Sequence, residues 1–268
     1  MTAAELARIV AMQRWVEEAT ATRVEPWRFG SAVFTDDFPA RYDSNFLRVE
    51  KPVGTATPGE LAAEADRLQA HLSHREVIVE DFDAGARLAA GFRELGYVVE
   101  RLAYMALRTE PSDAAALPVR EVSPQALRPT LLATNLAIDG MAPADAEMLA
   151  DFRPVSAERA GTRYFAAELD GVLASYCELY LHEGAAQVED VNTLEAFRNR
   201  GAGRAVVRAA IVEARAAGAD LIWLLADADD WPQHLYAKLG FERVGGAWQF
   251  TKMAPQHQRM QGAAASAP

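Results

Sequence analysis

The sequence has little that could build a disulfide framework, a metal site or a membrane span. Cys177 is its one cysteine, so no internal disulfide can form, and no histidine cluster accompanies it to complete a zinc site. No apolar run approaches the roughly 20 residues that a transmembrane helix requires. Residues 1–18 carry acidic side chains and lack the apolar core of a signal peptide. We therefore expect a cytoplasmic protein with no metal and no membrane partner.

Basic residues are also in short supply. The chain has 27 Lys and Arg against 38 Asp and Glu, which gives a formal net charge of −11. Nucleic-acid binding needs a basic stripe that displaces counterions from phosphates, so we expect no nucleic-acid partner. The acidic balance mildly favours a cationic substrate such as an amine, although net charge more often serves solubility.

The composition that is present is that of an ordinary soluble globular protein, and 268 residues predict two domains. In the C-terminal half, apolar periodicity and turn residues predict a mixed α/β arrangement, with a hairpin at Asp170-Gly171. The stretch from 254 onward, rich in Gln, Ala and Ser, is expected to be a disordered tail. The expected strands cover 118–122, 164–169, 172–181, 187–193, 221–225, 241–244 and 248–251, and the expected helices cover 124–135, 143–152, 203–217 and 232–239.

A constant offset of 144 residues aligns the two halves of the chain without a gap. Leu95-Gly96-Tyr97 falls on Leu239-Gly240-Phe241, and the order and length of the flanking elements match. We interpret the chain as a tandem duplication. The other aligned segments are 46–49 with 190–193, 60–70 with 204–214, and 77–79 with 221–223.

The duplication divides the chain at a short linker rich in Ala and Pro, residues 111–117. The first domain is expected at 1–113 and the second at 114–253. Ahead of residue 46 the first domain has only a helix over 3–18 and a strand near 31–34, so we expect a truncated copy.

A glycine-rich turn in the second domain leads from a strand into a helix. Arg198-Asn199-Arg200-Gly201-Ala202-Gly203 gathers free backbone N–H groups at the positive end of the helix dipole, where anions such as pyrophosphate bind. A GxG pattern alone is weak evidence. Here it follows the extended segment 188–193, and Leu235-Tyr236-Ala237-Lys238-Leu239-Gly240-Phe241 comes about 30 residues later.

Together these motifs resemble the GNAT superfamily of N-acetyltransferases, whose cofactor loop has the form Arg/Gln-x-x-Gly-x-Gly/Ala and whose later helix and strand often read Leu-Tyr-x-Lys-Leu-Gly-Phe. The resemblance covers 118–252. It implies an α/β fold of two GNAT-like domains, each a mixed central sheet flanked by helices, with acetyl-CoA as co-substrate. Backbone N–H groups would hold the pyrophosphate, and a strand would pair with the pantetheine amides. The implied cofactor-binding residues are Val191, Asn192, Thr193, Arg198, Asn199, Arg200, Gly201, Ala202, Gly203, Arg204 and Asp229.

Asp229 departs from the family pattern. Many relatives carry Asn there, whose amide bonds the pantetheine arm, and Ala at the position of Pro232. A carboxylate accepts a hydrogen bond but cannot donate one as an amide does, which puts this contact in doubt. Capping of the helix that begins near Pro232 is the alternative role, and we slightly favour it.

Transfer of an acetyl group from a thioester to an amine requires a base, donors for the oxyanion and an acid for the leaving thiolate. By resemblance the acid is Tyr236, whose phenol has a reference pKa of roughly 10 and can protonate a thiolate. The base is Glu189 or Asp190, which face opposite sides of one strand; we favour Glu189 narrowly, and an ordered water chain stays an alternative. The oxyanion donor is expected to be a backbone N–H near Asn192, where a bulged strand leaves donors unpaired.

Three other reactive side chains have weaker claims. Cys177 alternates with apolar residues and has no neighbouring His or Lys, so a buried structural thiol is favoured over a covalent acyl carrier. His234 is expected on the surface. Glu178 is a secondary candidate for the substrate side of the hairpin.

The first domain is expected to have lost the cofactor site. The offset of 144 places Thr57 on Gly201, Pro58 on Ala202, and Phe92 on Tyr236. Proline has no N–H to give, a β-branched threonine resists the backbone freedom of glycine, and phenylalanine has no hydroxyl. This copy should serve packing or substrate recognition, which leaves one coenzyme A per chain.

The sequence therefore predicts an acetyl-CoA-dependent N-acetyltransferase that acts on a primary amine of a small molecule or a peptide, by direct attack of the amine on the thioester. The main alternative is a non-catalytic acyl-CoA-binding pseudoenzyme. A nucleotide-binding module is disfavoured, because no Lys-Ser/Thr follows the glycines as a P-loop requires. The sequence does not identify the acceptor or the acyl chain length, and it leaves a homodimer open.

Overall fold

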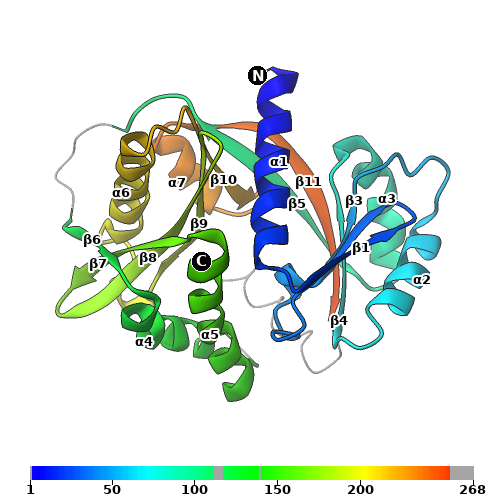
Figure 1. Cartoon of the computed structure of the whole chain (residues 1–268), viewed down its shortest axis with the longest axis horizontal. Coiled ribbons are helices and arrows are strands. Elements are labelled where there is room, and N and C mark those ends of the chain that lie inside the picture. The colour runs from blue at the N-terminus through cyan, green and yellow to red at the C-terminus, as the bar shows by residue number, and fades with distance from the viewer. Residues whose placement is uncertain (1, 112–116, 139, 254–268) are drawn as a thin grey trace.

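The computed structural model describes residues 2–111, 117–138 and 140–253. These residues form one continuous sheet with helices on both faces (Figure 1). The tail expected from residue 254 lies outside them, as does most of the expected linker. The helices are α1 (Ala3–Thr20), α2 (Pro58–Leu68), α3 (Phe82–Glu94), α4 (Pro124–Leu136), α5 (Pro143–Ala160), α6 (Ala202–Ala216) and α7 (Pro232–Lys238). The strands are β1 (Arg23–Trp27), β2 (Gly30–Phe34), β3 (Phe46–Val49), β4 (His74–Val79), β5 (Val98–Leu107), β6 (Val119–Val122), β7 (Arg163–Leu169), β8 (Val172–His182), β9 (Ala185–Thr193), β10 (Leu221–Asp227) and β11 (Phe241–Met253).

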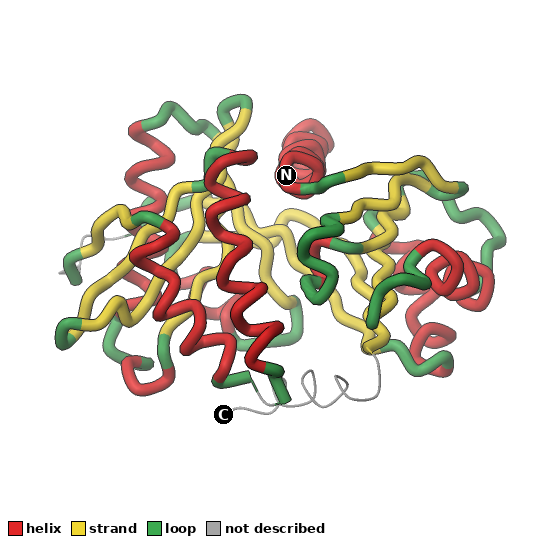
Figure 2. Tube along the Cα trace, turned by 60° about the horizontal axis from the view of Figure 1, so that its bottom comes forward, coloured by secondary structure: helices red, strands yellow, loops and turns green. Residues whose placement is uncertain are grey.

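The strands lie in the order β1-β2-β3-β4-β11-β5-β10-β9-β8-β7-β6. The β3–β4 and β9–β10 pairs are parallel, and the other neighbouring pairs are antiparallel. Figure 2 shows the sheet running unbroken from one side of the molecule to the other. The predicted α/β fold, with a mixed central sheet flanked by helices, is confirmed.

Two strands cross between the N-terminal half (2–111) and the C-terminal half (117–253) at the middle of the sheet. β5 follows α3 of the N-terminal half but lies between β10 and β11. β11 follows α7 of the C-terminal half but pairs with β4 as well as β5. Trp248 and Phe250 of β11 accordingly pack in the apolar core with residues of α2 and α3. The two halves therefore share their central strands.

Apolar cores lie on both faces of the sheet. On one face, α6 and α7 cover strands of the C-terminal half, and α2 and α3 cover those of the N-terminal half. On the other face, α4 and α5 cover β7 and β8, while α1 crosses the centre of the sheet (Figure 1). Ile9 and Met12 of α1 pack there with Tyr104 of β5 and Trp223 of β10. None of the described helices is long and apolar enough to cross a bilayer.

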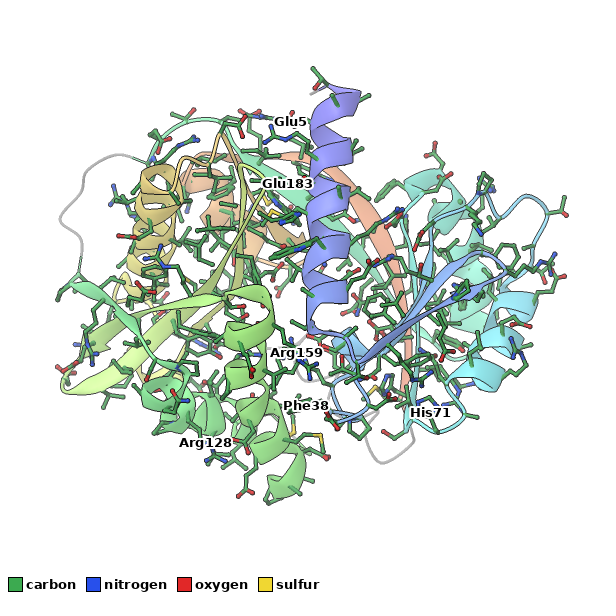
Figure 3. The ribbon with its side chains drawn as sticks, viewed as in Figure 1. Glu5, Phe38, His71, Arg128, Arg159 and Glu183 are labelled. Carbon is green, nitrogen blue, oxygen red and sulfur yellow. The ribbon has the colours of Figure 1, made fainter. Side chains whose placement is uncertain are left out.

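Side chains of α5 also meet the N-terminal half. Phe152 packs edge-on against Phe38 with 5.2 Å between the ring centroids, and the Arg41 guanidinium lies over the Phe152 ring. Nη1 of Arg159 donates to the carbonyl oxygen of Thr20 at 3.1 Å. Figure 3 labels Arg159 and Phe38 at this seam. The helix that flanks the candidate site is thus held from the other half of the chain.

The helix expected over 143–152 is longer than predicted, so its expected end at 152 is wrong. α5 continues from 152 to Ala160, through Pro154. Its extra turns carry the buried side chains of Arg153 and Ser156, which anchor them to the sheet. Gly161 then ends the helix in the left-handed conformation, with φ of 62°. Tertiary contacts therefore outweigh the cost of a proline inside the helix.

Two strand assignments also change. The expected strands 241–244 and 248–251 are one strand, β11, with a bulge between Arg243 and Gly245. β1 is an additional strand that contains Pro26, a residue that argues against a strand in the sequence. β1 lies at the sheet edge, where the missing N–H of proline costs no ladder bond.

The gapless alignment of the two halves is wrong at one strand. Leu47 of β3 lies opposite Val77 of β4, and Ala185 of β9 lies opposite Leu221 of β10. Val77 and Leu221 are 144 positions apart, but Leu47 and Ala185 are only 138 apart. The segment between the paired strand and the helix that follows is therefore six residues longer in the C-terminal half than in the N-terminal half. The extra residues of the C-terminal half lie in the region of the candidate site.

Candidate active site

The end of β9 leaves the sheet on one side. β9 pairs with β10 only from Ala185 to Val188, whereas its pairing with β8 continues to Thr193. The β8–β9 register shifts between Tyr176 and Glu178, and Asp190 opposite this shift has a φ of 45°. The strand is therefore bulged as well as splayed, as expected near Asn192. Its edge toward β10 is open to extended ligands beyond Val188.

The glycine-rich turn delivers α6 directly to this opening. Asn199 and Gly201 adopt left-handed conformations, with φ of 61° and 84°. Gly201 is the N-cap residue and no side chain caps the helix, so the N–H groups at the start of α6 keep their hydrogen-bonding capacity. A Cβ atom on Gly203 would lie 3.2 Å from Oγ1 of Thr193. The helix start and the end of β9 are therefore in close approach, which the glycine permits.

The two arginines of the loop lie at its exposed side. Arg198 and Arg200 are both exposed. Nη1 of Arg200 lies 2.9 Å from Oδ2 of Asp170, in the turn between β7 and β8, and its guanidinium lies over the ring of Phe197. Positive charge thus accompanies the free N–H groups at the start of α6, a combination suited to an anionic group.

Tyr236 reaches the same region from α7. Its side chain is buried at 7% exposure and packs in the core with Cys177 and Val188. Its hydroxyl has no hydrogen-bond partner within the described ranges. Burial raises the pKa of Tyr236, and the nearby carboxyl of Glu189 raises it further. The phenol therefore holds its proton and has a free donor.

Glu189 and Asp190 have different surroundings, which the sequence could not show. Glu189 is partly buried, and its Oε1 accepts a hydrogen bond of 2.6 Å from Nε2 of Gln187. Burial raises the pKa of Glu189 to about 8, although the bond from Gln187 opposes the shift. Asp190 is instead paired with Nη2 of Arg153. Of the two carboxyls, Glu189 has the environment of a titrating base near neutral pH.

Arg153 is a site residue that the sequence did not indicate. It is buried in α5, and its Nε lies 2.7 Å from Oε1 of Glu178. The hydroxyl of Tyr180 donates to Oε2 of Glu178 at 2.7 Å. Glu178, a secondary candidate for the substrate side, is therefore enclosed in an ion pair with the residue that also holds Asp190. A charged residue beside Pro154 on an apolar helix face was the available signal.

Asp229 does not cap α7, so this expectation is wrong. The N-cap residue is Trp231, which has helical backbone angles and makes no side-chain cap. Oδ2 of Asp229 accepts a hydrogen bond of 2.9 Å from Nε of Arg101 in β5, and this bond lowers the pKa of the Asp229 carboxyl. Because β5 lies beside β10 in the sheet, Arg101 of β5 is close to the loop that follows β10 and pairs with the carboxylate of Asp229 there.

The remaining candidates agree with their expected places. Cys177 is fully buried, and burial raises the pKa of its thiol, which leaves it unreactive. His234 is exposed. Within 2–111, 117–138 and 140–253, no group of three or more His, Cys, Asp and Glu side chains could hold a metal ion.

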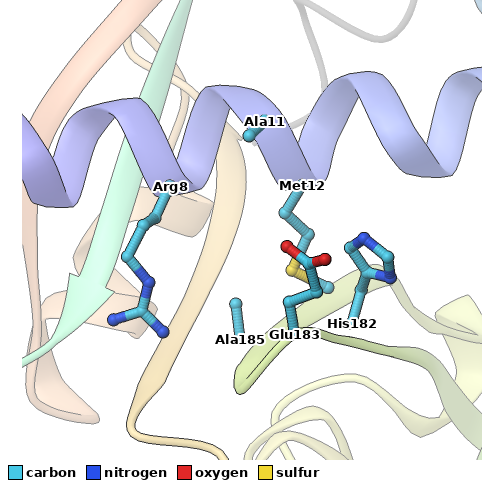
Figure 4. A pocket seen from close by; sticks show the side chains of 6 residues that line it. All are labelled: Arg8, Ala11, Met12, His182, Glu183 and Ala185. Carbon is cyan, nitrogen blue, oxygen red and sulfur yellow. The ribbon is translucent and has the colours of Figure 1, made fainter.

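A small pocket lies between α1 and the turn that joins β8 to β9 (Figure 4). Two of its polar side chains have other partners: the His182 ring stacks on the Trp15 ring with 4.1 Å between centroids, and Nη2 of Arg8 lies 2.6 Å from Oδ1 of Asp220. None of the predicted site residues lines it. The lining residues are Arg8, Ala11, Met12, His182, Glu183 and Ala185.

Comparison with known proteins bears on this arrangement. Residues 132–241 match the model of the Acetyltransferase (GNAT) family. This segment, which is less than half of the chain, is therefore similar to GNAT acetyltransferases. This match includes the splayed strand, the glycine-rich turn and α7 of the candidate site. Acetyl-CoA-dependent N-acetylation is the general activity of the GNAT family. No curated protein sequence matches the chain.

Solved structures share the fold well beyond residues 132–241. A functionally unknown conserved protein from Staphylococcus epidermidis has 14% identity and a TM-score of 0.68, covering 87% of this chain and 94% of its own. A GCN5-related N-acetyltransferase from Kribbella flavida has 18% identity and a TM-score of 0.63, covering 94% and 96%. One from Sphaerobacter thermophilus has 16% identity and a TM-score of 0.51, covering 73% and 65%. These likenesses concern the fold alone, and the first two extend across both halves.

Proposed function

We propose that the protein is an acetyl-CoA-dependent N-acetyltransferase that acts on a primary amine of a small molecule or a peptide, by direct attack of the amine on the thioester. The observation that carries the proposal is the uncapped start of α6 beside the splayed end of β9. Free N–H groups and an open strand edge together suit a pyrophosphate joined to a chain of amides. The GNAT match over 132–241 supports the same assignment.

Bound acetyl-CoA would supply an acetyl group activated as a thioester. The backbone N–H groups from Asn199 to Arg204 would hold the pyrophosphate, and Arg198 and Arg200 would add positive charge at the rim. The open edge of Val191, Asn192 and Thr193 would pair with the pantetheine amides. Gly203 fits this role, because any Cβ there would crowd Thr193 and narrow the approach. Asp229 is already paired with Arg101, so we give it at most a secondary contact.

The catalytic roles follow from protonation. Glu189 would accept a proton from the ammonium form of the acceptor and release it to solvent, which frees the nitrogen lone pair to attack the thioester carbon. A backbone N–H at the β9 bulge would stabilise the negative charge that develops on the carbonyl oxygen. Tyr236 would donate its proton to the sulfur as the carbon–sulfur bond breaks, and the proton that the nitrogen loses as the amide forms would restore the phenol. The raised pKa of Tyr236 keeps this proton in place until then.

Two measurements test the proposal together. Release of free thiol from acetyl-CoA is followed with a panel of primary amines, and acetyl-CoA binding is measured by calorimetry. Turnover with an amine and one bound acetyl-CoA per chain are expected. Binding without turnover would favour an acyl-CoA-binding pseudoenzyme, and an absence of binding would reject the assignment of the α6 site.

A further inference from the structure

A line of hydrogen bonds connects the N-terminal half to Glu189. Nη1 of Arg48, in β3, donates to Oε2 of Glu17 in α1 at 2.7 Å. Oε1 of Glu17 accepts from Nε2 of Gln13, one turn earlier, at 2.9 Å. Nε2 of Gln187, in β9, donates to Oε1 of Gln13 at 2.8 Å and to Oε1 of Glu189 at 2.6 Å. The line thus passes from one half of the molecule to the other through α1.

The orientation of each amide in this line is set by its neighbour. Burial raises the pKa of Glu17, and the ion pair with Arg48 opposes this shift and favours the carboxylate, which accepts from the amide nitrogen of Gln13. The carbonyl oxygen of Gln13 then faces Gln187, which must present its own amide nitrogen. The second hydrogen of that nitrogen is thereby directed at Glu189. Gln13, a residue of the N-terminal half, thus determines that Glu189 faces the amide nitrogen of Gln187 and not its carbonyl oxygen.

This orientation leaves one polar atom unsatisfied. Gln187 is buried at 1% exposure, and its Oε1 has no hydrogen-bond partner within the described parts of the chain. A buried acceptor without a donor disfavours the folded state. An apolar side chain of similar volume would avoid this cost, so Gln187 is a poor choice for packing alone. Its two donated bonds are the evident use of the residue.

We propose that Gln13 and Gln187 are positioning residues that hold the Glu189 carboxylate for proton transfer, so that α1 lets the N-terminal half complete the site of the C-terminal half. This inference rests on the role of Glu189 in the proposed function. Gln187 donates to the charged form of Glu189 and so keeps it available as a base in surroundings that favour the neutral acid. Gln13 prevents the Gln187 amide from rotating away.

Other charged groups around Glu189 would act on the same titration. Glu178 from β8 and Asp190 from β9 raise the pKa of Glu189, and Tyr236 approaches from α7. Arg153 from α5 neutralises part of the charge of Glu178 and Asp190. From α1, Glu17 lies beyond Gln13 and is itself paired with Arg48. Gln187→Leu leaves all of these groups in place, and Gln13→Leu removes one bond to Glu17, which keeps its pair with Arg48.

The first test reads Glu189 directly and needs no acceptor. The full chain is labelled with ¹³C at the glutamate side-chain carboxyl, and the Glu189 resonance, assigned through Glu189→Gln, is titrated by NMR. Gln187→Leu should raise the Glu189 pKa by about one unit, the loss expected for one bond to a charged group. Gln13→Leu should raise it by a smaller amount. Unchanged titration in both variants would overturn the inference, whatever the activity of the protein.

A matched control separates positioning from general loosening of α1. Arg8→Gln removes the exposed pair with Asp220, which also ties α1 to the C-terminal half but does not approach Glu189. We expect its Glu189 titration to match the unmodified protein. An equal shift in Arg8→Gln would mean that α1 acts only through packing, and this result too would overturn the inference.

The second test uses turnover once an amine acceptor is found. Gln13→Leu and Gln187→Leu should lower kcat about 10-fold and shift the rising limb of the pH profile to higher pH, with the KM for acetyl-CoA unchanged. Lower kcat with an unmoved pH profile would contradict positioning of the base. If no amine supports turnover, the proposed function fails, while the NMR titration still decides whether Gln13 and Gln187 control Glu189.

Discussion

Helices α2 and α6 begin 144 positions apart, and each connects the two strands of a parallel pair, β3–β4 and β9–β10. Their first turns differ in capping and in the backbone N–H groups that they offer to an anion. α2 starts with a capping box: the Thr57 side chain accepts from the Glu60 N–H at 3.3 Å, and Oε2 of Glu60 accepts from the Thr57 N–H at 2.8 Å. Pro58 follows without an N–H. α6 starts at Gly201-Ala202 with no side-chain cap. One helix start is closed by its own residues and the other is left for a ligand.

The strands before the two helices differ in the same sense. β3 remains paired to its end, and the N–H of Glu80 adds a bond of 3.3 Å to the carbonyl of Val49. β9 runs five residues beyond Val188, its last residue paired with β10, and bulges at Asp190. The free helix start and the open strand edge therefore occur together at α6, and neither occurs at α2. We expect the proposed cofactor site to need both.

Replacement of the glycine at each helix start should break the comparison most strongly. Gly203→Trp is expected to abolish acetyl-CoA binding, because even a Cβ there would lie 3.2 Å from Thr193 Oγ1. The matched change Gly59→Trp in α2 meets only Thr57 Oγ1 at 4.0 Å and should leave the affinity unaltered. Calorimetry with acetyl-CoA measures both, with thermal melting as a check of folding. Equal affinities for the two variants would reject α6 as the pyrophosphate site.

Tyr236 and Phe92, which the offset of 144 residues aligns, give the next largest expected effect. Tyr236→Phe gives the C-terminal half the side chain that Phe92 provides in the N-terminal half, and should lower kcat on the order of 100-fold with little change in cofactor affinity. Tyr97→Phe removes a hydroxyl from the core of the N-terminal half and serves as the control. Steady-state turnover with an amine acceptor measures both. If turnover survives in Tyr236→Phe, the thiolate departs without this acid.

Much of the fold could be predicted because the signals are local. Asp170-Gly171 predicted a hairpin, and both residues have the positive φ, 53° and 78°, that a tight two-residue turn requires. The glycine loop before α6 was also readable, since a left-handed residue and an uncapped helix start depend on adjacent positions. Helix ends with glycine, such as Gly240 at φ of 90°, follow the same rule.

Features that depend on distant residues could not be predicted. The bond between Gln13 and Gln187 spans 174 positions, and nothing in either local sequence distinguishes it from a surface glutamine. Arg101 and Asp229 are 128 positions apart and meet because β5 lies beside β10 in the sheet, an arrangement that no periodicity in the sequence reveals. The choice between Glu189 and Asp190 depended likewise on Arg153 of α5. Side-chain partners across the sheet are set by topology, and a single sequence carries no direct signal of it.

The titration of Glu189 should make the stability of the C-terminal half depend on pH. Its folded pKa of about 8 lies above the ordinary value of 4.5, so the folded state binds the proton more tightly than the unfolded chain. Its contribution to stability is full below about pH 4.5 and is lost as pH rises toward 8. At pH 8, Glu189→Gln should therefore melt at a higher temperature than the unmodified protein. At about 1.4 kcal/mol per pKa unit, its free energy of unfolding should be larger by a few kcal/mol. The gain should disappear at pH 4.5, and a gain independent of pH would contradict the raised pKa.

The smallest expected effect comes from the capping box of α2, and it sharpens what closes that helix. Thr57→Ala should cost about 1 kcal/mol of unfolding free energy in urea, the usual loss for an N-cap. It should create no second acetyl-CoA site at α2, because Pro58 still lacks an N–H and β3 is still paired with β4 as far as its last residue, Val49. Glu60→Ala in addition removes the negative charge at the helix start and should give the same result by calorimetry. Binding of a second acetyl-CoA by the double variant would mean that the cap alone closes the start of α2, and that the shorter segment between β3 and α2 does not matter.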